Sequence, residues 1–156
     1  MTTTTQEQIA RQGIETLDAS QGFAVLATSC DSQPYTSIVA FAMAPGMSGA
    51  VFATPKKTSK YKNILKDPRV SMLLDLRPGT GGGLMEAEAV TIIGKASTLR
   101  RGLRRTELEA CLMKKHPELA AFFAAPDTAI VYVKAEKYVH VGRFQSVSIW
   151  SPMSES

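Results

Sequence analysis

The order of the predicted strands and helices is the feature that most constrains this fold. Strand-like segments come first, a single helix interrupts them, further strands follow, and a pair of helices precedes the last strands. A parallel doubly wound sheet needs strands that alternate regularly with helices, and this chain lacks that alternation. The order favours a mainly β, α+β fold with a largely antiparallel sheet or barrel of about six strands and about four helices.

Turn residues and hydrophobic spacing set the predicted boundaries of these elements. The predicted strands span residues 23–29, 35–43, 50–54, 69–76, 85–98, 128–141 and 144–150. The predicted helices span residues 6–18, 58–66, 103–115 and 117–124. The helix at 58–66 ends before Pro68 because the residue that precedes a proline disfavours the helical backbone conformation.

The composition indicates a single folded domain over residues 1–156. With 44% hydrophobic and 21% charged residues, the chain can bury a core without disulfide or metal cross-links. No apolar run approaches the roughly 18 residues of a membrane helix. Residues 1–8 lack the basic start and apolar stretch of a secretory signal. We therefore expect a cytoplasmic protein that does not associate with a membrane.

Basic residues outnumber acidic ones, 18 against 14, and gather in two clusters. The clusters are Lys56, Lys57, Lys60, Lys62, Lys66 and Arg69, and Arg100, Arg101, Arg104 and Arg105. The net charge of +4 favours anionic partners. Clustered arginines are compatible with nucleic-acid binding, but no aromatic residues are interleaved with them. We therefore expect a solvated junction there and no nucleic-acid partner.

Cysteine and histidine spacing predicts no metal centre. Cys30 and Cys111 form no CxxC pair, so both are expected to be ordinary thiols. His116 and His140 have no carboxylate or second histidine at metal-ligand spacing. Packing roles are therefore expected for both histidines.

Residues 52–71 carry the strongest functional signal in the chain. They run strand, basic loop, helix, strand. If Thr58 caps the helix, free backbone N–H groups and the positive end of the helix dipole lie beside three lysines. These are Lys56, Lys57 and Lys60. Phosphate oxygens accept several charge-assisted hydrogen bonds at once, so this combination suits a phosphate group. The alternative is a solvated basic helix with an ordinary cap.

The same segment shows a distinctive order of side chains. In chain order they are Thr54, Thr58, Ser59, Lys60, Asn63, Ile64, Asp67, Pro68, Arg69, Val70 and Ser71. This order resembles the flavin-phosphate segment of the pyridoxamine 5′-phosphate oxidase-like family, the FMN-binding split barrels. Residues 23–28 with Pro34 resemble the first hairpin of that family, and residues 89–96 resemble its later core strand. The resemblance therefore extends over most of the chain.

The resemblance implies a homodimer of six-stranded antiparallel split β-barrels with flanking helices, with two FMN molecules in the grooves between the subunits. By position, the FMN phosphate would be held by Thr54, Thr58, Ser59 and Lys60. Ser59 stands where many members carry arginine, and Lys57 with Lys56 would compensate for the missing cation. The isoalloxazine ring would lie along the strand formed by Tyr35, Thr36, Ser37, Ile38 and Val39.

The resemblance also implies an FMN-dependent oxidoreductase that acts on a small substrate or electron donor, with no catalytic residue identified. Pyridoxamine phosphate oxidation is not expected. The C-terminal Arg-x-His element of the true oxidase has no counterpart here, and Ala89 replaces its ring-contacting glutamine. The alternatives are a non-catalytic flavin-binding or sensing protein, or a member that handles a deazaflavin or haem. The glycine-rich loop at residues 77–83 is a candidate lid.

Overall fold

The computed structural model describes residues 2–76, 87–142 and 146–152. The elements, in chain order, are α1 (Thr2–Ser20), β1 (Phe23–Cys30), β2 (Gln33–Met43), η1 (Pro45–Met47), β3 (Gly49–Pro55), α2 (Ser59–Lys66), β4 (Arg69–Leu76), β5 (Glu88–Thr98), α3 (Leu103–Lys115), η3 (Pro117–Leu119), α4 (Ala120–Ala124), β6 (Thr128–Val141) and β7 (Val147–Trp150). The candidate lid at residues 77–83 lies outside the described residues.

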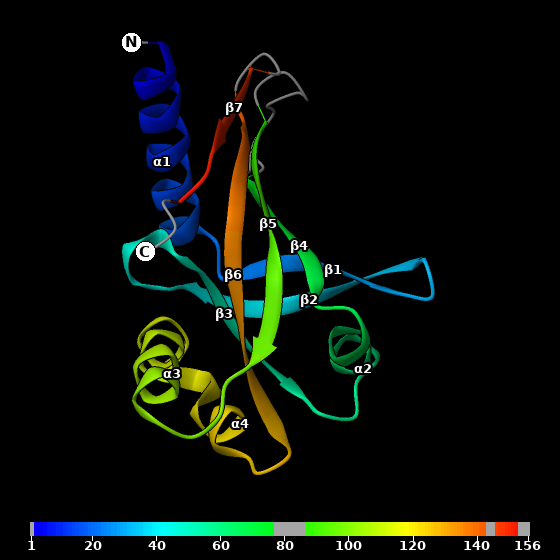
Figure 1. The fold of residues 1–156 in the computed structure, drawn as a ribbon. Coiled ribbons are helices and arrows are strands. Elements are labelled where there is room, and N and C mark those ends of the chain that lie inside the picture. The colour runs from blue at the N-terminus through cyan, green and yellow to red at the C-terminus, as the bar shows by residue number, and fades with distance from the viewer. Residues whose placement is uncertain (1, 77–86, 143–145, 153–156) are drawn as a thin grey trace.

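Six of the strands close into an antiparallel barrel (Figure 1). Their order is β3-β2-β1-β4-β5-β6, and β6 pairs back onto β3 to complete the circle. In the described part of the chain one more strand, β7, pairs with the C-terminal part of β6. The structure confirms the predicted six-stranded antiparallel barrel with flanking helices, and it adds β7 outside that barrel.

Alternation along the strands decides which side chains enter the core, because successive residues of a strand point to opposite faces. In β1, Ala24 and Leu26 are buried, whereas Phe23 and Val25 are 61% and 37% exposed. The outer face of the barrel around β1 is therefore partly apolar and open to solvent.

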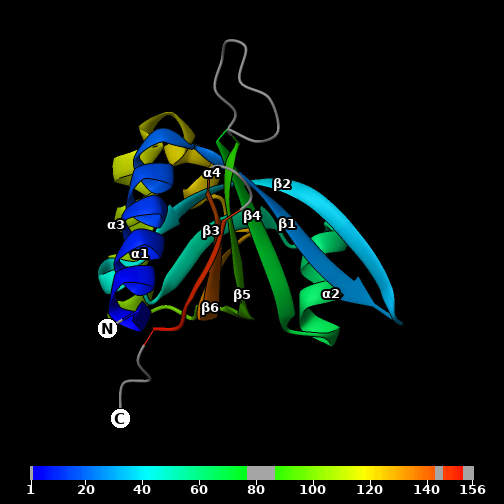
Figure 2. The ribbon, with the colours of Figure 1, turned by 90° about the horizontal axis from the view of Figure 1, so that it is seen from above.

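Helices close the barrel core from different sides. Ile14 of α1 and both Tyr61 and Ile64 of α2 belong to the same core cluster as the inward-facing strand residues. Leu108 and Leu112 of α3 form a second, smaller apolar cluster outside the barrel. Figure 2 shows α2 across the barrel from α1, α3 and α4. None of the described helices is long and apolar enough to span a membrane.

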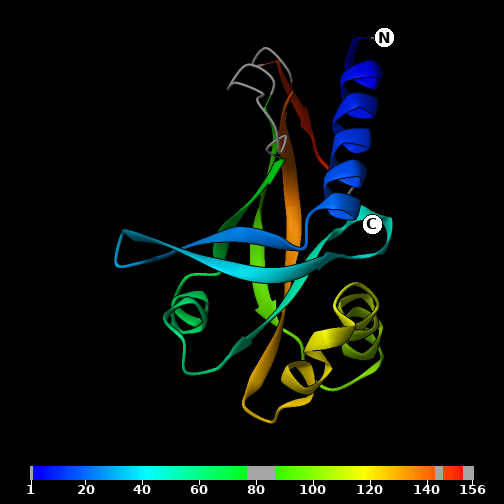
Figure 3. The same ribbon diagram turned by 180° about the vertical axis from the view of Figure 1, so that it is seen from behind.

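The seam between β2 and β3 is only partly closed. β2 has 11 residues, but it pairs with β3 only through Phe41, Ala42 and Met43. Residues 33–40 pair with β1 alone, so their second edge has no strand partner within the described residues. The β1–β2 hairpin projects from the barrel here (Figure 3). Backbone donors and acceptors along this edge are therefore available to other groups.

Some element boundaries differ from those predicted. The N-terminal helix begins at Thr2 rather than at residue 6, because the leading threonines carry no apolar periodicity that would reveal it. The predicted helix at 117–124 starts as the 3₁₀ turn η3, which suits Pro117 because proline lacks an N–H. The described part of the predicted strand at 85–98 begins at Glu88, and that of the strand at 144–150 begins at Val147.

Two buried polar side chains tie loops and helices to the barrel. The Tyr138 hydroxyl donates to the Met47 carbonyl oxygen at 2.7 Å, and burial raises the pKa of Tyr138 well above its ordinary value. A ring nitrogen of His116 lies 2.9 Å from the Phe41 carbonyl oxygen. Because Phe41 is where β2 begins to pair with β3, His116 fastens the end of α3 to the closed part of the seam.

Candidate functional site

The loop between β3 and α2 is organised by two threonine hydroxyl groups. The Oγ1 atoms of Thr54 and Thr58 lie 2.9 Å apart, and the Thr58 hydroxyl donates to the Pro55 carbonyl oxygen at 2.9 Å. Thr58 is the residue before α2, and its Oγ1 accepts from the backbone N–H of Tyr61. The structure thus shows Thr58 in the capping position that the sequence analysis assumed, with Thr54 buried directly beneath it.

The first turn of α2 exposes donors and positive charge. The backbone N–H groups of Ser59 and Lys60 occupy the first helical positions, where no intrahelical acceptor exists. Ser59 is exposed and Lys60 is half-buried, while Lys56 and Lys57 extend into solvent from the preceding loop. The N–H of Lys56 donates to the Asp127 carbonyl oxygen at 2.9 Å, which fixes that loop against the start of β6.

Helix α2 is held against the barrel by specific side-chain contacts. The Asn63 side-chain amide donates to the buried Thr28 hydroxyl at 3.0 Å, and the Thr98 hydroxyl donates to the Tyr61 hydroxyl at 3.2 Å. Thr28 is the cross-strand partner of Tyr35. The contact from Asn63 therefore places α2 next to the hairpin that contains the predicted ring-binding strand.

The register across the open seam places the two predicted parts of the flavin site opposite each other. The β2–β3 ladder pairs Phe41 with Phe52, and its antiparallel register, continued past the last pair, would set Val39 opposite Thr54. No such pairing forms, and the strands separate at this level. The predicted ring-binding strand and the predicted phosphate-binding residues therefore border the same gap.

The five residues of the predicted ring-binding strand have different environments. Tyr35 and Ile38 are 44% and 70% exposed, and Thr36 is also exposed. Val39 is 4% exposed and belongs to the core, so only its backbone faces the seam. The Ser37 hydroxyl is buried and has no hydrogen-bond partner within the described residues. An unpaired buried hydroxyl is costly, and no sequence pattern signalled this one.

Neither the histidines nor the cysteines are among the predicted flavin-site residues. His116 contacts the Phe41 carbonyl, and His140 is 5% exposed with its Nε2 atom 3.8 Å from a carboxylate oxygen of Glu88. Burial raises the pKa of the Cys111 thiol, and Cys30 lies in β1. No group of three or more potential metal ligands occurs among the described residues.

The C-terminal end of α2 holds a bidentate ion pair that sequence analysis did not single out. The Nε and Nη2 atoms of Arg69 donate to the two carboxylate oxygens of Asp67 at 3.0 and 2.8 Å, and the Arg69 backbone N–H donates to the same carboxylate at 3.1 Å. The side-chain hydrogen bonds from Arg69 lower the pKa of Asp67 to about 2. The pair therefore stays charged throughout the neutral range.

A barrel of six antiparallel strands with one open seam, and with a capped basic helix inserted between β3 and β4, defines the split-barrel class. The family model for pyridoxamine 5′-phosphate oxidase matches residues 10–142. The chain therefore belongs to the pyridoxamine 5′-phosphate oxidase family. The resemblance drawn from residues 54–71 is confirmed.

Solved structures show the same fold in proteins of low sequence identity. A haem-binding protein from Mycobacterium smegmatis has a TM-score of 0.81 at 19% identity, covering 91% of this chain and 57% of that protein. The haem storage protein HutZ from Vibrio cholerae has a TM-score of 0.74 at 15% identity, covering 88% and 99%. A FAD-binding protein from Mesorhizobium loti has a TM-score of 0.70 at 16% identity, covering 91% and 94%. This chain thus spans little more than half of the Mycobacterium smegmatis protein. No curated protein has a matching sequence.

Replacing Arg69 by alanine should raise the pKa of Asp67 from about 2 towards the ordinary value of 3.8, because the hydrogen bonds that stabilise the carboxylate are lost. A folded-state pKa below the unfolded one means that Asp67 contributes its full stabilisation above the unfolded pKa. That contribution disappears as the pH falls towards 2. NMR titration of the carboxyl groups measures the pKa of Asp67 in the wild-type and Arg69→Ala proteins. Arg11→Ala is the control. An unchanged pKa in Arg69→Ala would contradict this assignment.

Proposed function

We propose that the protein binds FMN in the open seam between β2 and the β3–α2 loop and acts as an FMN-dependent oxidoreductase on a small substrate. One observation carries the proposal. The unpaired edge of β2 and the donor-rich start of α2 border the same gap, and the β2–β3 register, continued past its last pair, would set Val39 opposite Thr54. Membership of the pyridoxamine 5′-phosphate oxidase family supports a flavin as the ligand of this gap.

The first turn of α2 supplies the groups that a phosphate needs. The free N–H groups of Ser59 and Lys60 and the ammonium of Lys60 would donate to its oxygens. The hydroxyl hydrogen of Thr58 is used by the Pro55 carbonyl oxygen and that of Thr54 by Thr58, so the part of these two threonines is to hold this turn in place. Lys57 adds positive charge from the exposed side of the loop.

The edge of β2 supplies the groups that a flavin ring needs. The unpaired backbone of residues 33–40 would hydrogen bond to the polar edge of the ring. The Ser37 hydroxyl, buried and without a partner, would gain a hydrogen bond there, and the exposed side chains of Tyr35 and Ile38 would cover apolar ring surface. A bound flavin supplies a ring that takes a hydride or an electron pair from a donor.

The histidines favour a flavin over a histidine-ligated haem. Haem iron is commonly held by an imidazole nitrogen, which must be free to reach the metal. The chain has two histidines, and both are buried: His116 is 4% exposed and already contacts the Phe41 carbonyl, and His140 is 5% exposed beneath α1. Neither histidine is therefore available as a haem ligand at the seam.

The outer face of the barrel supports a homodimer. Ile38, Val25 and Leu73 are register partners on β2, β1 and β4, and all three are exposed to solvent. Phe23, 61% exposed, extends the same face. A contiguous apolar patch on a strand surface marks an interaction site, and a second copy of this chain would bury it next to the seam. FMN would then lie in a groove completed by the partner subunit.

Lys60→Ala should weaken FMN binding by about 1.5–3 kcal/mol, roughly tenfold to a hundredfold, because a charge-assisted phosphate contact is lost. Titration of FMN into the apoprotein, followed by flavin fluorescence, measures this change. Lys66→Ala removes an equivalent charge from the last turn of α2 and should leave the affinity unchanged.

Equal affinities for the Lys60→Ala and wild-type proteins would place the phosphate elsewhere. A wild-type protein that takes up no FMN, and shows no flavin absorption bands on reconstitution, would contradict the proposed function itself. Mixing the reconstituted protein with NADPH or NADH distinguishes the two flavin-based hypotheses, an oxidoreductase and a non-catalytic flavin-binding protein. Flavin reduction and turnover support an oxidoreductase, and complete inertness towards donors supports a non-catalytic flavin-binding protein.

Leu73→Glu should convert the dimer into a monomer, because it places a charge in the centre of the apolar outer face. Leu103→Glu is the matched control, since Leu103 is 92% exposed on α3, away from that face. Sedimentation velocity measures the mass of each protein. A monomeric wild type, or a Leu73→Glu protein that remains dimeric, would refute the assigned interface.

A further inference from the structure

A row of cations crosses the outer face of the barrel at the C-terminal end of α2. Arg69 on β4 is the register partner of Lys95 on β5, and Lys95 is in turn the register partner of Lys134 on β6. All three side chains are exposed. We propose that this row and the cavity beside it form a second anion site, separate from the proposed flavin phosphate site, for the phosphate or diphosphate group of a small molecule.

Placing these charges opposite one another costs stability. Directly opposed residues of an antiparallel pair have Cβ atoms about 5 Å apart, and like charges at that separation are destabilising. Carboxylates offset part of the repulsion: Asp67 pairs with Arg69, and Glu136 lies 3.8 Å from Lys95. Lys134 has no ion-pair partner within the described residues. The row therefore keeps an excess of positive charge that a bound anion would neutralise.

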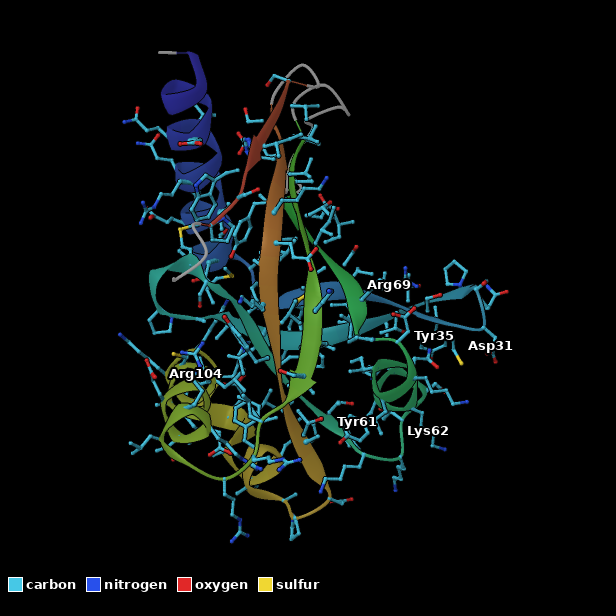
Figure 4. The ribbon with its side chains drawn as sticks, in the orientation of Figure 1. Asp31, Tyr35, Tyr61, Lys62, Arg69 and Arg104 are labelled. Atoms are coloured by element: carbon cyan, nitrogen blue, oxygen red, sulfur yellow. The ribbon has the colours of Figure 1, made fainter. Side chains whose placement is uncertain are left out.

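Arg69 is held ready to donate to a ligand. Its bidentate contact with Asp67 uses Nε and one Nη2 hydrogen, which leaves the remaining guanidinium hydrogens free. Because the pKa of Asp67 lies near 2, the carboxylate keeps this orientation at every neutral pH. Figure 4 shows Arg69 near the β1–β2 hairpin, on the side of α2 away from Tyr61 and Lys62. A guanidinium fixed in this way loses little conformational freedom when it binds an anion.

A cavity of about 380 Å³ lies against the row, a volume that suits a phosphate group with part of a small organic molecule. Its polar lining includes Arg69, Lys95, Glu136, Ser29 and Ser71. The two serine hydroxyls can donate to phosphate oxygens, and the loose Lys95–Glu136 contact can give way to a stronger anion.

Gly94 lines this cavity where β5 and β6 come close together. A Cβ atom at this position would overlap the backbone carbonyl oxygen of Lys134, so the glycine permits the close approach of β5 and β6 at their bulge. This close approach brings Lys95 of β5 and Glu136 of β6 to the same cavity.

The second site is distinct from the proposed flavin phosphate site. The two lie at opposite ends of α2, which has eight residues and therefore a length of about 12 Å. A single phosphate group cannot contact both Lys60 and Arg69 across that distance. The two sites can be tested separately by single substitutions.

The test is calorimetric titration of inorganic pyrophosphate into the wild-type protein and its variants. Lys95→Ala and Arg69→Ala should each weaken pyrophosphate binding by about tenfold to a hundredfold, since each removes a charge-assisted contact. Lys114→Ala, at an exposed lysine on α3, should bind within about twofold of wild type, and Lys60→Ala should keep the binding that Lys95→Ala weakens. Thermal unfolding without pyrophosphate confirms that every variant is folded, and pyrophosphate should raise the midpoint of wild type more than that of Lys95→Ala.

Three results would overturn the proposal. They are the absence of pyrophosphate binding to wild type, binding that Lys95→Ala leaves unchanged, and binding that only Lys60→Ala abolishes. The last result would place pyrophosphate at the start of α2, so it would remove the second site while supporting the proposed flavin phosphate site. Conversely, binding that depends on Lys95 in a protein that takes up no FMN would support the second site and contradict the proposed function.

Discussion

The incomplete pairing of β2 with β3 is the constraint on which the rest of the site depends. A strand edge left without a partner exposes backbone donors and acceptors, and natural proteins usually cover or use such an edge. Here residues 33–40 keep one free edge, while the preceding strand β1 and the following three residues hold β2 in the barrel. The barrel nevertheless stays closed, because all seven residues of β3 pair with β6 on the other side.

The position of α2 decides which groups lie beside this free edge. A helix of eight residues is too short to be stable alone, so its placement comes from contacts with the barrel. The Asn63–Thr28 hydrogen bond and the burial of Tyr61 and Ile64 provide them. These contacts aim the first turn of α2 at the seam and leave its last turn beside the cation row that includes Arg69. One short helix thus separates two positively charged regions on the same protein.

The features that could be predicted from the sequence are those encoded in local patterns of residues. Turn residues and strand-like runs predicted a largely antiparallel sheet or barrel, and the cap at Thr58 follows from residue type. The order of residues from Thr54 to Ser71 identified the family, and that resemblance implied the six-stranded barrel. The open seam could not be predicted, because the alternating pattern of β2 is the same whether its second edge is paired or free. The pairing of Arg69 with Lys95 could not be predicted either. It depends on the register of β4 and β5, two strands that are joined by a long connection. The unpaired Ser37 hydroxyl depends on packing that no spacing reveals.

Amide hydrogen exchange with and without FMN tests the central claim, which is that the flavin occupies the seam. FMN should slow exchange of the amides in residues 35–40 and in the first turn of α2, because ligand contacts replace solvent there, and it should leave the paired amides around Met72 in β4 unchanged. Protection confined to α3 and α4, or no change along residues 35–40 at saturating FMN, would show that the seam is not the flavin site.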